Sequence, residues 1–440
     1  MELQTFLTSI MIGSASGVLA GLLPGVGATV TVLLLFPYLI TQDPISIVVC
    51  FTSLYSMSQF VGSVPAILLG IPGETSSLPA VIEGKKLKLL GKVNESIAYT
   101  ALGSVVGSMI CLFFVFVIRS YLDNLVYVYR TSIQISLIFL VLLVLIYRGG
   151  NKIFINLLLL AVGFTLGMIG MNGVSGTGFL HFGYANLQSG LPLFPVILSL
   201  FVLPQFYQTI NDSKQNKKIQ TFEIKLEYFV NFFKYISASV RGTILGFIGG
   251  FCPGLTHAFS SQLAYQSEQL IKHKEDRELK SLISAETANN AGAFSAILPL
   301  IILGIPISSS EALLLTIMQM RGWDLSISDY APILTASVQA LVLVNLLGLI
   351  TAWPFAKHIS KLLLFPEKIL YPSLFLILIL LNYYIGMKHW NELWYMAVLS
   401  IFLPIGWLFR RYNTMPLIFA FIIAKYFYSL LVVGGQLWLQ

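Results

Sequence analysis

Long apolar stretches recur from one end of this 440-residue chain to the other. Two of them are IQISLIFLVLLVLIY (133–147) and LYPSLFLILILLNYYIG (370–386). Such lengths approach the roughly 20 residues that an α-helix needs to cross the hydrocarbon core of a bilayer. Only 10% of the residues are charged, against about 25% in a typical soluble domain. The sequence therefore predicts an all-α polytopic membrane protein, and the net charge of +7 is assigned to cytoplasmic loops rather than to a nucleic-acid-binding surface.

Two motifs occur twice, in the same order, and indicate an internal duplication. In the first, a glycine at every fourth residue is followed by Pro-Gly; it spans 13–25 and returns, shifted by 229 residues, at 242–254. The second is PAILLGIP at 65–72, which returns as PLIILGIP at 299–306, a shift of 234 residues. Glycine spacing alone would indicate only close packing of membrane helices, but the shared order of two motifs favours duplication.

The duplication divides the chain into three parts. We predict a first transmembrane repeat at 1–210, a basic cytoplasmic linker at 211–235 and a second transmembrane repeat at 236–440. After its two motifs, each repeat continues with four apolar segments, at 97–118, 124–147, 152–170 and 190–210, and at 331–353, 366–387, 392–409 and 413–436.

The charges of the loops indicate that the repeats cross the membrane in opposite directions. The loop after the first Pro-Gly element (41–46) has no Lys or Arg, whereas its counterpart (267–280) has four. After the Gly-Ile-Pro element the order reverses, with four Lys at 83–92 and a single Arg at 321–329. An N-terminus outside the cell places twenty of the 26 Lys and Arg residues inside, where such residues accumulate. The predicted fold is therefore a pair of inverted-topology repeats.

Both Pro-Gly elements and both Gly-Ile-Pro elements interrupt apolar stretches, so we expect helices to break there. The apolar runs after the Pro-Gly elements, 28–40 and 256–266, are too short for a full crossing and predict re-entrant or broken helices. Irregular backbone at membrane depth survives only where it is buried in protein or lines a cavity. Paired breaks in inverted halves are thus typical of a transporter's binding site, and close helix packing is the alternative explanation.

The candidate substrate- or ion-binding residues cluster at these breaks. They offer hydroxyl groups, freed backbone amides and helix N-termini, which can hold an anion without Lys or Arg, while freed carbonyl groups can hold a small cation. In the first half these residues are Pro24, Gly25, Gly27, Thr29, Gly73, Thr75 and Ser76. In the second half they are Pro253, Gly254, Thr256, His257, Ser308 and Ser309.

Three acids lie near the same elements: Glu74, Glu286 and Glu311. An ionisable group inside a membrane is a functional candidate because burying it is expensive. Glu286 is the strongest of the three, since it runs into an apolar helix with Asn289 and Asn290 alongside. The alternative is an ordinary carboxylate at a helix start in the membrane interface. No catalytic residue and no metal site, apart from one for a transported sodium ion, is expected.

These motifs resemble those of the TctA family, the large transmembrane subunit of tripartite tricarboxylate transporters. The resemblance lies in the glycine and Pro-Gly pattern of both halves, in GIPGETSS (70–77) and in ETANNAG with the following PLIILGIP (286–306), and it covers 13–201 and 241–322. It implies a translocation path that works with a small four-helix membrane subunit and an extracytoplasmic solute-binding protein, driven by an ion gradient. The residues that it implies are Pro24, Gly25, Gly27, Pro253, Gly254, Glu286, Asn289 and Asn290.

We therefore expect a secondary active transporter permease in the plasma (inner) membrane of a prokaryote. It would import a small organic anion, a di- or tricarboxylate, coupled to a sodium or proton gradient, by alternating access around a midplane site between the repeats. No cofactor is expected, and the sequence has no Gly-x4-Gly-Lys-Ser/Thr motif for ATP. The alternatives are a membrane-embedded enzyme, which would need paired acids or a motif such as His-Glu-x2-His, and a non-transporting scaffold.

Overall fold

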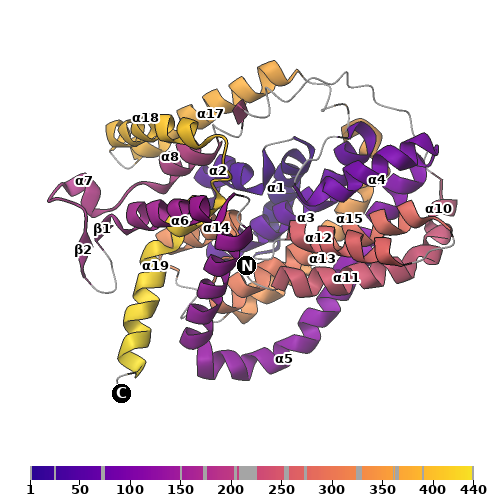
Figure 1. Cartoon of the computed structure of the whole chain (residues 1–440), viewed down its shortest axis with the longest axis horizontal. Helices are drawn as coiled ribbons and strands as arrows, with labels where there is room; N and C mark the ends of the chain where they lie inside the picture. Colours follow the sequence, from indigo (N-terminus) through magenta and orange to yellow (C-terminus); the bar gives the residue numbers. More distant parts are fainter. Residues whose placement is uncertain are drawn as a thin grey trace.

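The computed structural model of the chain describes residues 2–23, 26–70, 75–148, 151–171, 176–202, 206–207, 225–251, 257–271, 275–323, 330–359, 361, 366–388 and 391–438. Nearly all of these residues are helical (Figure 1). A short antiparallel ribbon of β1 (Gly170–Met171) and β2 (Gly178–Phe179) lies with α7 (Ala185–Gln188) at one end of the molecule, and α4 (Leu78–Leu89) and α10 (Glu227–Asn231) lie at the other.

Within the described part of the chain, seven helical segments are long and apolar enough to cross a membrane. This agrees with the predicted all-α membrane fold. The segments are Leu3–Leu22, Pro44–Leu69, Val93–Val117, Ala331–Ala352, Lys368–Lys388, Glu392–Phe409 and Met415–Val432.

Two buried helices form the centre of the structure. α3 (Pro44–Leu69) is buried from Ser46 to Leu68, and α13 (Arg277–Leu303) is buried from Ser281 to Leu303. Each packs along one neighbour that carries the repeated glycines, α1 (Leu3–Leu22) on α3 and α11 (Ile236–Phe251) on α13. The polar residues of α3 and α13 are therefore shielded from lipid by other helices.

The repeated glycines allow these helices to approach backbone to backbone. A Cβ atom added to Gly13 would lie 2.2 Å from the carbonyl oxygen of Cys50, and one added to Gly242 would lie 2.2 Å from that of Ser284. The next glycines of each helix meet the carbonyl groups four and eight residues further along α3 and α13. Both glycine motifs thus make the same contact with their partner helix.

The predicted helix breaks are found where the motifs lie. α1 ends at Leu22, just before Pro24, and the chain resumes in the short helix α2 (Gly27–Leu39). α11 ends at Phe251, and the short helix α12 (His257–Leu270) follows. Both lengths match the expected short runs.

α3 and α13 also end alike. Gly70 and Gly304 cap them with φ of 70° in each case, a left-handed conformation that glycine adopts without strain. The chain then continues into η1 (Thr75–Ser77) and α4 in the first half, and into α14 (Ser309–Met320) in the second.

The segments after these motifs differ from the prediction at one point. The two apolar segments expected at 97–118 and 124–147 belong to a single helix, α5 (Val93–Arg148). A straight helix of 56 residues would be about 84 Å long, and Figure 1 shows that α5 is strongly curved. Backbone hydrogen bonding continues because no proline interrupts this stretch.

The remaining helices follow the predicted segments. After α5 come α6 (Ile153–Met168), α8 (Leu193–Ile197) and the π-helical turn η2 (Leu198–Val202). The second half continues with α15 (Ala331–Ala352), α16 (Ala356–Ile359), α17 (Glu367–Lys388), α18 (Glu392–Phe409) and α19 (Met415–Trp438). Residues 211–224 of the predicted linker lie outside the described residues, and its last part forms α10 and η3 (Phe232–Tyr235), which pack against Tyr99 of α5.

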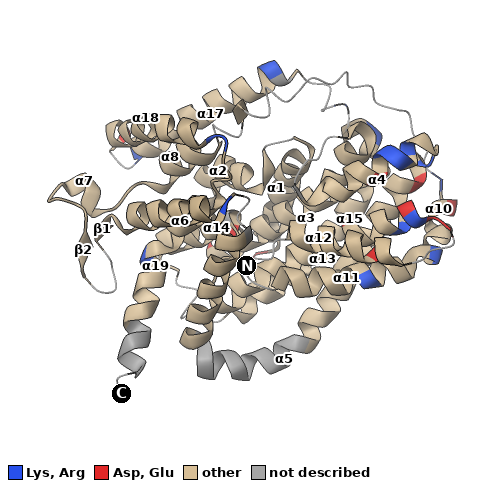
Figure 2. Ribbon diagram, viewed as in Figure 1, with Lys and Arg blue, Asp and Glu red and all other residues tan. Residues whose placement is uncertain are grey.

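Loops that were predicted to share a membrane face contact each other. Lys92 and Asp276 form an ion pair of 2.6 Å between the two basic loops. Arg321 donates a hydrogen bond to the carbonyl group of Gln42, joining the two loops that are poor in positive charge. Charged residues are densest around α4 and α10 (Figure 2).

Candidate functional site

Helix α12 connects a helix break of the second half to a helix break of the first half. The hydroxyl of Tyr55 in α3 and Nδ1 of His257, the first residue of α12, lie 3.1 Å apart. One turn further along α12, the Ser261 hydroxyl donates a 2.9 Å hydrogen bond to the carbonyl group of Ser76 in η1. The helix that follows the Pro-Gly break of the second half is thus bonded to the turn that follows the Gly-Ile-Pro break of the first.

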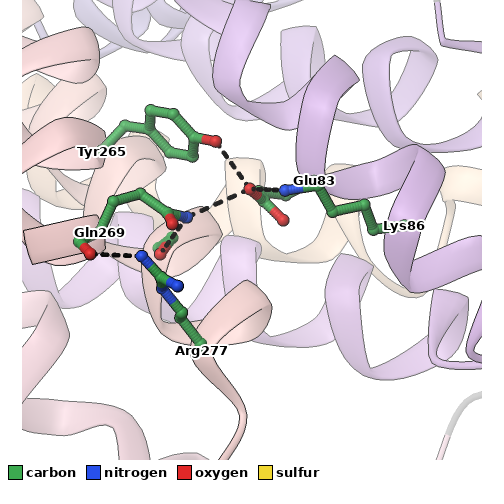
Figure 3. A network of polar contacts seen from close by, with 6 residues as sticks. Glu83, Lys86, Tyr265, Gln269 and Arg277 are labelled. Atoms are coloured by element: carbon green, nitrogen blue, oxygen red, sulfur yellow. Dashed lines mark hydrogen bonds and ion pairs between the residues drawn. The ribbon is translucent and has the colours of Figure 1, made fainter. Parts of the chain in front are cut away.

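The same face of α12 continues its contacts with α4. Tyr265 donates a 2.7 Å hydrogen bond to Oε1 of Glu83, and the side-chain amide of Gln269 donates one of 3.2 Å to the same oxygen. Lys86, one turn along α4, pairs with that oxygen at 2.8 Å (Figure 3). The Glu83 side chain is fully buried, whereas that of Lys86 is 49% exposed. This carboxylate therefore joins the two halves near the end of the molecule that carries the basic loops.

Buried polar groups continue from η1 into α3. The Ser76 hydroxyl donates a 3.2 Å hydrogen bond to Oε1 of Gln59, whose amide donates to the Ser58 hydroxyl at 3.0 Å. The Ser77 hydroxyl is buried and has no hydrogen-bond partner among the described residues. A Cβ atom on Gly62 would lie 3.2 Å from that hydroxyl, so Ser77 points at α3. These residues present hydroxyl and amide groups of the kind that can hold an anion.

Glu286 lies in the middle of α13 and is fully buried. Glu286 is therefore not at a helix start, as the alternative explanation required. Neither of its oxygens has a hydrogen-bond partner among the described residues, and the same holds for the side-chain amide of Asn289. Asn290 instead donates to the hydroxyl of Ser104 in α5 at 2.7 Å. An isolated ionised carboxylate would be very costly in such surroundings, so this arrangement favours the protonated form or a bound cation.

Glu311 caps its own helix. Its Oε2 accepts hydrogen bonds from the backbone amides of Ile307 (2.7 Å) and Ser308 (3.2 Å), and the Ser308 hydroxyl accepts one from the amide of Glu311. This reciprocal capping box satisfies backbone amides at the N-terminus of α14. The geometry gives Ser308 a structural role, and the neighbouring Ser309 begins the helix.

The other predicted residues fall into two groups. Gly27 and Thr29 begin α2, where Gly27 has φ of 49°, and Thr75 begins η1. Pro24, Gly25, Gly73, Pro253, Gly254 and Thr256, with Glu74, lie outside the described residues.

Glu83 and its partners were not predicted from the sequence. Glu83 stands in a stretch with four Lys, which is typical of an exposed loop, and Tyr265 lies 182 residues away along the chain. The one available signal was the spacing of His257, Ser261, Tyr265 and Gln269, four residues apart, which places them on one face of a helix. Among the described residues, no group of three or more His, Cys, Asp or Glu side chains could hold a metal ion.

The many apolar helices define a multi-pass membrane protein. Its helices are interrupted at the repeated motifs and enclose buried polar side chains, an interior suited to transport. The chain belongs to the tripartite tricarboxylate transporter TctA family, whose model matches residues 7–420. It is therefore a component of a tricarboxylate transporter and not an enzyme. Transporters of this type also contain a small membrane subunit and a solute-binding protein.

One curated relative is similar to this chain over most of its length. It is the "Uncharacterized 52.8 kDa protein in TAR-I ttuC' 3'region" of Agrobacterium vitis, which is 27% identical over 387 residues, 84% of this chain and 76% of the relative. No solved structure matches the chain.

Proposed function

We propose that the chain forms the translocation path for a small organic anion, a di- or tricarboxylate, and imports it by alternating access coupled to a sodium or proton gradient. The observation that carries the proposal is the bond between α12 and η1. Ser261 and Ser76 follow breaks that belong to opposite halves, and they meet in a buried position. A site built from paired breaks of two inverted repeats is the arrangement typical of secondary transporters.

The chemistry around this meeting point suits a carboxylate. Hydroxyl and amide donors come from Ser76, Ser77 and Gln59, with His257 and Tyr55 one turn away on the facing helices. Hydroxyl and amide donors can hold an anionic group without a full positive charge nearby. Of the candidate substrate-binding residues, Thr75, Ser76 and His257 therefore take precedence over Ser308, whose backbone amide is bonded to the Glu311 side chain, and over Ser309, the first residue of the helix that Glu311 caps.

Glu286 is the residue proposed to couple transport to the ion gradient. Its buried carboxyl would bind a proton directly, or a sodium ion together with oxygen atoms such as that of the Asn289 amide. Either ion would neutralise a charge that is costly at this depth. Coupling follows if release of the ion and release of the substrate need the same opening.

The inverted orientation of the repeats and the outside position of the N-terminus are part of the proposal. They are supported by two contacts between loops that are predicted to lie on the same face of the membrane. These are Lys92 with Asp276 and Arg321 with Gln42. The small membrane subunit and the extracytoplasmic binding protein would deliver substrate to the face opposite the basic loops, in the plasma membrane of a prokaryote.

Uptake into proteoliposomes tests the proposal. Vesicles holding the chain with the other two components of its transporter should accumulate radiolabelled citrate or succinate when a sodium or proton gradient is applied. An ionophore that collapses the gradient should abolish accumulation, and accumulation that persists would refute the coupling. If the folded chain supports no movement of any di- or tricarboxylate tested, the non-transporting scaffold replaces the proposal.

A further inference from the structure

The short helices α2 and α12 differ in the face that each presents at four-residue spacing. His257, Ser261, Tyr265 and Gln269 of α12 all hydrogen-bond to residues of the first half. The positions of α2 that correspond by the 229-residue shift are Ala28, Val32, Phe36 and Ile40. These are apolar, and the ring of Phe36 packs edge-on against Phe194 at 5.8 Å. At these positions the short helix of the second half is therefore polar, and that of the first half is apolar.

This difference indicates which short helix can move. Separating an apolar face from its neighbours exposes hydrophobic surface to water or substrate, which is costly. A hydrogen-bonded face can exchange its partners for water or for polar groups of a substrate at a small net cost. The face of α12 is thus suited to opening and closing against η1 and α4, whereas α2 is suited to a fixed position.

Glu83 is the residue that closes the α12 face against the first half. Its Oε1 accepts from a phenol, an amide and an ammonium group, those of Tyr265, Gln269 and Lys86. Its Oε2 is buried and has no hydrogen-bond partner among the described residues. A carboxylate of a substrate could accept hydrogen bonds from the same three donors, because hydrogen bonds to an ionised acceptor are the strong ones. In the closed arrangement Glu83 occupies them instead.

We propose that Lys86, Tyr265 and Gln269 form a carboxylate-binding subsite in the exit path at the basic-loop end, which Glu83 fills as a built-in carboxylate while α12 closes the path. The inference rests on the proposed import of a carboxylate and adds the moving element and a second binding place. When α12 moves away, a substrate carboxylate can take the donors that Glu83 leaves.

The experiment measures how well the closed path protects a buried cysteine. Ser77→Cys is introduced into a chain in which Cys50, Cys111 and Cys252 are replaced. Ser77 suits this because it is only 1% exposed, adjoins Ser76 and has no hydrogen-bond partner among the described residues that the change would remove. A membrane-impermeant maleimide is applied from the basic-loop side of reconstituted vesicles. Glu83→Ala should raise the labelling rate by about tenfold or more, the effect of losing strong hydrogen bonds between the halves.

Acetate is the probe for the subsite. In the Glu83→Ala chain, millimolar acetate should restore protection in a saturable way, and chloride at the same ionic strength should not. Adding Tyr265→Phe should remove the acetate effect. The matched control is Glu268→Gln. Glu268 is a buried carboxylate like Glu83, but it lies on α12 and pairs with Arg241 of the same half, at 3.0 Å from its Nε. This control should leave the labelling rate unchanged.

Three results would overturn the proposal. They are labelling in Glu83→Ala no faster than in Glu268→Gln, equal protection by acetate and chloride, and an acetate effect that survives Tyr265→Phe. If the alanine variant does not fold, Glu83→Gln serves in its place, with a smaller rise in labelling because its amide oxygen still accepts one bond. Labelling needs no net uptake, so failure of the wild-type chain to import carboxylates would refute the proposed function and leave this measurement readable.

Discussion

Replacing Gly13 by alanine tests the close contact between α1 and α3. The new Cβ atom would lie 2.2 Å from the carbonyl oxygen of Cys50 and 2.8 Å from Cβ of Ser53. Ordinary contact begins at about 3.4 Å, so the helices would have to separate by about 1 Å, and such overpacking costs about 1–3 kcal/mol. Alanine regains up to about 1 kcal/mol of helix propensity. The expected net loss is about 1–2 kcal/mol in the free energy of unfolding.

Unfolding in mixed detergent and dodecyl sulfate micelles, followed by circular dichroism, measures this loss. Gly62→Ala is the matched control, because Gly62 is also inside a helix but its nearest contact would be the Ser77 hydroxyl at 3.2 Å. This control should be close to wild type. Gly242→Ala should lose about as much as Gly13→Ala, since its Cβ atom would meet the Ser284 oxygen at the same 2.2 Å. A Gly13→Ala chain as stable as Gly62→Ala would refute the packing argument.

Glu286→Gln should unfold near the wild-type midpoint, because the amide has almost the same shape, yet lose gradient-driven uptake; undiminished uptake would contradict the coupling role. Glu311→Ala should lose about 1–2 kcal/mol in the same unfolding assay, because two amides at the start of α14 lose their acceptor. Burial raises the pKa of Asp276, but hydrogen bonds from Lys92 and Tyr235 outweigh it and hold the pKa below its usual value. The stabilisation from this partly exposed group, under about 1 kcal/mol, is present above about pH 4 and lost as the pH falls through the lowered pKa. Unfolding midpoints across this range should therefore fall more steeply for the wild type than for Asp276→Asn, and parallel curves would contradict it.

The helix breaks were predictable because their cause is local. Proline lacks a backbone donor, and glycine can adopt the left-handed conformation without strain, as Gly70 and Gly304 do. The continuity of α5 was not predictable, because the charged residues between its apolar segments suggested a loop, while a helix can run on through residues of that kind. Local sequence signals thus predicted the ends of helices better than they predicted the continuity of a helix.

The candidate site was predicted only in part, because contacts decide its chemistry. His257 and Ser76 were expected because each follows a helix break. In the structure His257 begins α12, and the same helix is hydrogen-bonded to Ser76. Ser308 was expected on the same grounds, but Glu311 turns toward it and caps α14. Glu83 was missed because its burial depends on a helix almost two hundred residues away.

The sequence alone determined the membrane class and the helix ends next to the repeated motifs, since apolar length and Pro or Gly act through the chain itself. Only the tertiary structure decided which polar groups face one another: Glu83 with α12, Glu286 with no hydrogen-bond partner in the described part of α13's surroundings, and Glu311 with its own helix. The physical reason is that the cost of a buried charge depends on the donors that distant helices bring to it.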